Sequence, residues 1–183
     1  MSDEDYYRLA QTQFSIVGPQ LSRAEIEAVI PNPFPGKEDL VQFYLRFNGG
    51  SRTPQGGVIH CGNPAHQVSR DNLGILRIEG FLSIVSNPED RMLPFRPMLR
   101  SHAFDLHTYA AIPKMMDFFR QHIPIAFEHS GNYCYIDLQN GCVPLLIRDE
   151  WKEGPIEIAP SFREFVSKFW NIPPAGLLSG ADA

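Results

Sequence analysis

The stretch LVQFYLRFNGG, residues 40–50, shapes the first half of the fold. Its large apolar residues recur at the helical spacing i, i+3, i+4 and i+7, at Leu40, Phe43, Tyr44 and Phe47. Asn48 and Gly49 then suit the left-handed turn that closes many helices, because glycine has no Cβ to clash and asparagine tolerates this conformation. We therefore predict a largely buried helix that stops at Asn48-Gly49-Gly50, and the stop serves shape before chemistry.

The composition indicates one folded domain with an acidic balance. The chain has 183 residues, of which 43% are hydrophobic and 20% charged, so it has ample material for one core. A net charge of -5 argues against a nonspecific grip on nucleic-acid phosphates, which depends on a surplus of Lys and Arg. A basic partner fits this charge better.

Cysteine usage and hydropathy predict a cytoplasmic location. The chain has an odd number of cysteines, Cys61, Cys134 and Cys142, and it is large enough to fold without disulfide bonds. We therefore expect free thiols in a reducing compartment. No apolar stretch approaches the roughly 20 residues that cross a bilayer. The acidic start MSDEDYY also differs from the basic start of a signal peptide.

Capping signals predict a helix near each end of the chain. Ser22 and Glu25 have the spacing of a capping box, and the proline-rich residues 31–36 forbid continuation of the helix that starts there. Ser161 and Glu164 repeat this spacing. A helical apolar stripe follows them at Phe162, Phe165, Val166 and Phe169.

Between these ends the pattern is mostly extended. Short runs rich in branched residues predict strands between residues 56 and 87, and NPEDRMLPFRPMLRS at 87–101 is predicted to be irregular. A short helix is expected at 112–121, with proline in its first turn. The clearest strand signal, IPIAFEHSGNYCYIDLQNGCVPLLI at 123–147, predicts an antiparallel meander with a tight hairpin at Asn140-Gly141.

Strand alternation assigns the middle run of this meander to two faces. One face holds Tyr133, Tyr135 and Asp137. The other face holds Cys134, Ile136 and Leu138. We expect the second face to be the buried one.

Three motifs in this order resemble one known family. Phe34-Pro35 stands before the helix that ends in Asn48-Gly49-Gly50. The predicted central strands carry Gly131-Asn132 and then YCYIDLQNG, which contains Asn140-Gly141. The run IEIAPSFREFVSKFW, residues 156–170, closes the pattern. With these motifs the chain resembles the SUKH superfamily, the cell-wall-regulator-like proteins of the Smi and Knr type, many of which are immunity proteins in bacterial toxin systems.

The resemblance implies an α+β fold in which N-terminal and C-terminal helices flank an antiparallel β-sheet. We expect a single domain over residues 22–170, an N-terminal segment over 1–21 and a tail over 171–183. The resemblance transfers no catalytic residue to this chain.

Two histidine clusters raise the alternative of a metal site. His60, Cys61 and His66 form the first cluster, and His102, Asp105 and His107 form the second. Neither has the paired second half of a structural zinc motif, so we expect no metal. No phosphate-binding or dinucleotide-binding glycine motif is present, so we expect no cofactor. Cys61 beside His60 is the one candidate for a nucleophile.

The favoured hypothesis is an immunity-type binding protein that neutralises a cognate protein toxin, such as one of the basic nuclease type, by direct binding and occlusion. It includes no binding to nucleic acid or membrane. Its candidate contact residues are the acidic Asp105, Glu128, Asp137, Asp149, Glu150 and Glu153 and the aromatic Tyr133, Tyr135 and Trp151. One alternative is a metal-dependent enzyme that uses His60, His66, His102 and His107. The other is an intracellular regulatory scaffold.

Overall fold

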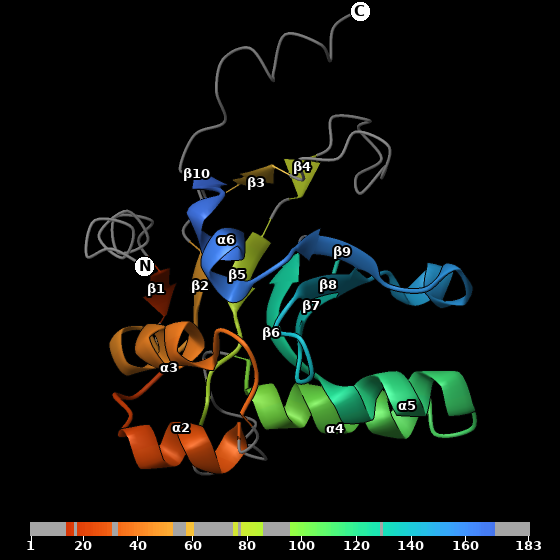
Figure 1. Ribbon diagram of the computed structural model, residues 1–183, viewed down its shortest axis with the longest axis horizontal. Coiled ribbons are helices and arrows are strands. Elements are labelled where there is room, and N and C mark those ends of the chain that lie inside the picture. The colour runs from red at the N-terminus through yellow and green to blue at the C-terminus, as the bar shows by residue number, and fades with distance from the viewer. Residues whose placement is uncertain are drawn as a thin grey trace, which may run out of the picture.

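A seven-stranded antiparallel sheet forms the centre of the protein, as the computed structural model of the chain shows (Figure 1). The structure describes residues 14–16, 18–30, 33–52, 58–60, 75–76, 78–85, 96–128 and 130–170. The strands of this sheet, in spatial order, are β1 Phe14–Ile16, β2 Gly50–Arg52, β5 Ile78–Phe81, β6 His122–Glu128, β7 Tyr133–Asp137, β8 Val143–Leu146 and β9 Ile156–Ala159. A separate three-stranded sheet has the order β10 Phe169–Trp170, β3 Val58–His60 and β4 Ile75–Leu76.

Helices cover both faces of the large sheet. They are α2 Arg23–Val29, α3 Lys37–Arg46, α4 Met98–Thr108, α5 Pro113–Gln121 and α6 Phe162–Ser167, with a 3-10 element, η1, at Arg148–Glu153. The α+β architecture with an antiparallel sheet and flanking helices is therefore confirmed. Figure 1 shows α4 and α5 side by side beneath β6 to β9, while α2 and α3 lie at the other end of the sheet.

The helix starts follow the predicted capping chemistry. At α2 both halves of the capping box form, because Ser22 Oγ accepts from the backbone N–H of Glu25 and the Glu25 carboxylate accepts from the backbone N–H of Ser22. At α6 the Ser161 side chain accepts from the backbone N–H of Glu164. The proline of α5 occupies its first turn, where a missing N–H does no harm.

Asn48 joins three segments of the chain at the point where α3 ends. Its Nδ2 donates to the carbonyl oxygens of Pro19 and Ile84, both at 2.7 Å. Its Oδ1 accepts from the backbone N–H of Ile84 at 2.8 Å. Its own carbonyl oxygen accepts from Gly18 N at 2.8 Å and from Ser83 Oγ at 2.9 Å. The predicted helix stop is therefore also an anchor that uses every polar atom of the Asn48 side chain.

Gly49 is required next to this anchor. Its φ of 68° lies in the left-handed region, which favours glycine. A Cβ at this position would overlap Ser83 Oγ and would lie 2.8 Å from the backbone of Leu82. The prediction of a left-handed glycine after the helix is confirmed, although the helix itself ends one residue before Phe47, whose backbone is extended.

An aromatic cluster holds α3 and α6 against one face of the sheet. The ring of Phe43 lies 4.6 Å from that of Phe81 in β5 and 5.3 Å from that of Phe162 in α6, measured between centroids. The strand register continues this face through Ala126 of β6 to Cys134 of β7. As expected, Cys134 and Ile136 are buried.

The opposite face of β7 is also buried, and its predicted exposure is wrong. Tyr135 is 0% exposed, because its ring packs against Phe118 and Phe119 of α5 at centroid distances of 5.1 and 5.9 Å. Tyr133, two residues earlier on the same face, is also buried. The tyrosines look amphipathic in sequence, but α4 and α5 cover them, so both faces of the sheet belong to the core.

The hairpin at Asn140-Gly141 is wider than the predicted tight turn. The closing backbone hydrogen bonds join Asp137 to Cys142 and to Gly141, and the side chain of Asn140 accepts from the backbone N–H of Cys142. Gly141 has a φ of 77°, and a Cβ there would overlap the carbonyl oxygen of Pro35. Two motifs that are far apart in sequence, Phe34-Pro35 and Asn140-Gly141, therefore meet in the fold.

A helix replaces part of the region predicted to be irregular. Residues 98–108 form α4, whose first backbone N–H, from Met98, donates to the carbonyl of Ser83 at 2.8 Å. The helix was missed because it buries a carboxylate, that of Asp105, on its inner face and exposes an aromatic ring, that of Phe104. Its pattern therefore does not read as an apolar stripe.

Some sequence predictions fall at the limits of the described ranges. The domain boundaries at residues 22 and 170 stay predictions, and β1, from the predicted N-terminal segment, pairs with β2. Cys61 and His66 lie outside the described residues, and His60 is described only as part of β3. Among the helices described here, none is long and apolar enough to traverse a bilayer.

Replacing Asn48 by alanine is expected to destabilise the protein by about 3 kcal/mol, because the buried backbone groups of Ile84 lose their partner and the Pro19 carbonyl loses a part-buried hydrogen bond. The free energy of unfolding in urea measures the effect. Asn140→Ala is the matched control, since Asn140 is exposed and water replaces its contact, and it should cost less than about 1 kcal/mol. Equal losses in the two variants would contradict the anchoring role of Asn48.

Candidate functional site

A buried carboxylate joins α4 to the sheet. Asp105 is 0% exposed, and its Oδ2 accepts from the hydroxyl of Tyr135 in β7 at 2.8 Å. Its Oδ1 accepts from Nη2 of Arg148, the first residue of η1, at 2.6 Å. Three elements that are distant in sequence are thereby linked through one side chain. We expect this link to fix the position of η1 relative to α4.

Aromatic rings surround the Arg148 guanidinium. Its central carbon lies 4.5 Å from the ring centroid of Tyr133 and 5.7 Å from that of Phe104. Such contacts are favourable because the ring face carries negative charge density. Arg148 Nε is buried without a hydrogen-bond partner among the described residues, so the cation is held by Asp105 and by the rings.

Burial sets the protonation of this cluster. It raises the pKa of the Asp105 carboxyl, whereas the hydrogen bond from Tyr135 and the charge of Arg148 oppose the rise. Burial also raises the pKa of the Tyr135 hydroxyl, so this hydroxyl stays protonated and donates a hydrogen bond to Asp105. A phenol and a guanidinium that are both committed to Asp105 stabilise structure and leave no free acid or base.

The segment after Arg148 carries exposed negative charge. Asp149, Glu150 and Glu153 are exposed, while Trp151 is half-buried and packs against the core. The Nζ of Lys152 lies 5.8 Å from the Trp151 ring centroid. Because Trp151 anchors the segment, the carboxylates project from a fixed 3-10 turn.

The structure separates the predicted contact residues into two groups and leaves Asp137 between them. Asp105, Glu128, Tyr133 and Tyr135 are buried, so their predicted role as surface contacts is corrected. Asp149, Glu150, Trp151 and Glu153 lie together on η1 and keep access to solvent. Asp137 is half-buried. The second group alone is carried forward as a candidate binding surface.

Glu128 and Asp137 act within turns. The Glu128 carboxylate accepts from the backbone N–H groups of Ser130 at 2.8 Å and Asn132 at 2.9 Å, and so closes the turn between β6 and β7. Asp137 Oδ1 accepts from the backbone N–H of Gln139 at 2.7 Å in the next turn. These carboxylates were predicted as partner contacts, but their lone pairs satisfy local backbone donors.

The second histidine cluster does not converge on a common point. His102 Nε2 lies 2.7 Å from the carbonyl oxygen of Phe119 and so links α4 to α5, whereas His107 is exposed. Asp105 is committed to Tyr135 and Arg148. Within the described ranges, no group of three or more His, Cys, Asp or Glu residues is arranged to hold a metal ion.

The two described cysteines have no activating environment. Cys134 is buried in β7. Burial raises the pKa of the Cys142 thiol, and the charges of Asp137 and Glu157 raise it further. A raised pKa disfavours the thiolate, which is the nucleophilic form. Both residues therefore fit a structural role.

A third cluster surrounds His122 at the start of β6. Its ring stacks on that of Phe118 at 3.9 Å, and its Nδ1 lies 2.7 Å from the Phe118 carbonyl oxygen. A carbonyl only accepts, so Nδ1 carries the proton of the neutral ring. Burial lowers the pKa of the His122 imidazole against the opposing effects of that carbonyl and of Asp137.

The fold and the motif positions define the class of protein. A model of the SMI1 / KNR4 family (SUKH-1) matches residues 24–168 of the chain. This protein therefore belongs to the SMI1 / KNR4 family, and its predicted kinship with the SUKH superfamily is confirmed. No curated protein and no solved structure gives a significant match to the chain.

Sequence reasoning missed two residues of the cluster that Asp105 and Arg148 form. Arg148 stands at the end of an apolar strand and was not considered, although arginine is enriched in protein interfaces. Phe104 lies inside HAFDLH, residues 102–107, where the sequence pattern pointed only to His102, Asp105 and His107. The useful signal was an aromatic residue on the polar side of an amphipathic segment.

Asp105→Ala is expected to destabilise the protein by about 3 kcal/mol, because it leaves the Arg148 cation and the Tyr135 hydroxyl without their buried partner. Urea unfolding followed by circular dichroism measures this loss. Asp117→Ala is the matched control, since Asp117 is exposed and pairs with Arg120 only at the surface, and it should change stability by less than about 0.5 kcal/mol. A loss at Asp105 as small as that at Asp117 would contradict the structural role.

His122 is expected to make the protein less stable at acidic pH. Because the folded state lowers the His122 pKa below its ordinary value of 6.5, the unfolded chain binds the proton more readily, and stability falls as the pH drops below 6.5. Unfolding free energies of the wild type and of His122→Asn between about pH 7.5 and about pH 5.5 test this. The variant should lose part of the pH dependence, while His107→Asn, at an exposed histidine, should keep it. Identical pH profiles for all three proteins would refute the assignment.

Proposed function

We propose that this protein is an immunity-type binding protein, which neutralises a cognate bacterial protein toxin by direct binding and occlusion. The observation that carries the proposal is membership of the SMI1 / KNR4 family (SUKH-1) across residues 24–168, since many proteins of the wider superfamily are immunity proteins. The proposal includes a cytoplasmic location, no bound cofactor and no enzymatic activity. A regulatory scaffold would use the same kind of surface and would differ in its partner.

The distribution of charge supports a binding role. The chain carries a net charge of -5, which speeds encounter with a basic partner and disfavours contact with nucleic acid. The buried carboxylates of Asp105 and Glu128 are engaged in internal hydrogen bonds, so a partner would meet other acidic groups, such as the exposed Asp149, Glu150 and Glu153. A basic nuclease-type toxin domain, whose substrate cleft attracts phosphates, would attract the same acidic surface.

Co-expression with a candidate toxin encoded next to the gene of this protein tests the proposed function. Cells that carry the toxin alone should stop growing, and cells that also carry this protein should survive, because the bound toxin cannot reach its substrate. The two purified proteins should also elute together in size-exclusion chromatography. An unrelated acidic protein of similar size is the control for charge alone. Absence of both rescue and complex would end the proposal.

A further inference from the structure

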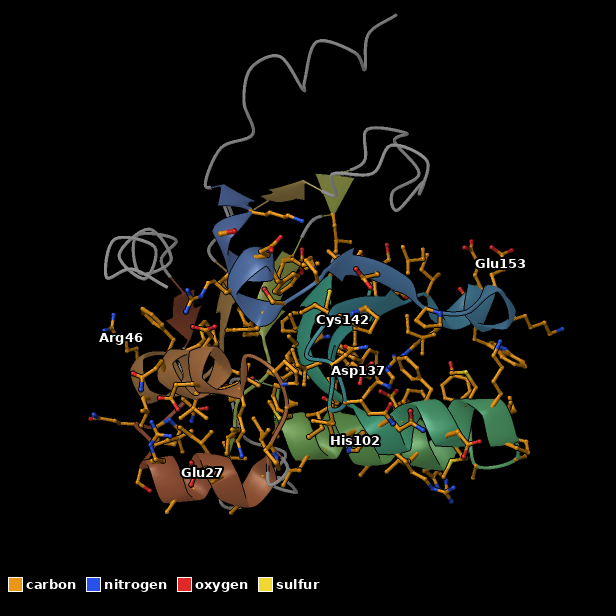
Figure 2. All side chains as sticks on the ribbon, in the orientation of Figure 1. Glu27, Arg46, His102, Asp137, Cys142 and Glu153 are labelled. Atoms are coloured by element: carbon orange, nitrogen blue, oxygen red, sulfur yellow. The ribbon has the colours of Figure 1, made fainter. Side chains whose placement is uncertain are left out.

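We draw no further inference here: the strongest candidate, the surface patch on α4 where Leu99 and Phe104 are exposed (the helix that carries His102 in Figure 2), carries no proposal because nothing in the structure shows what covers it.

Discussion

The hydrogen bonds of Asn48 are the constraint on which the arrangement of the sheet and helices depends. They fix the end of α3 to the segment before α2 and to the segment after β5. Ser83 belongs to the same network, and its carbonyl accepts the first backbone N–H of α4. The position of α4 is therefore tied to the end of α3. The bonds that join Asn48 to Ile84 and to Ser83 are buried, which strengthens them because no water competes for the donors.

Asp105 connects α4, and with it this network, to η1 at the surface. It receives hydrogen bonds from β7 and from η1, so a helix placed by Asn48 in turn holds the acidic segment in position. A buried carboxylate is costly to desolvate, and it is tolerated here because an arginine and a phenol compensate it. The protein thus uses one class of side chain in two ways: interior carboxylates organise the elements, and exposed carboxylates on η1 provide charge.

Sequence reasoning succeeded where a signal is local. The capping box at Ser22, the serine cap at Ser161, the helical stripe of α3 and the meander of β6 to β8 all depend on residues within a few positions of one another. It failed for α4 and for the face of β7 that carries Tyr135. Asp105 and Tyr135 are hydrogen-bond partners, but they lie 30 residues apart in the sequence. A buried polar side chain forms hydrogen bonds with donors that are distant in sequence, and no local sequence pattern identifies those donors.

The sequence by itself determined the family, the acidic balance and the positions of most turns and helix ends. Backbone conformation at Gly49 and at the capping serines follows from local sterics and short-range hydrogen bonds, which each stretch of chain carries with it. Only the tertiary structure decided which acidic and aromatic residues face solvent. That choice was made by packing: α4 and α5 close over one face of the sheet and bury its tyrosines, while the same packing leaves Phe104 outside beside Arg148.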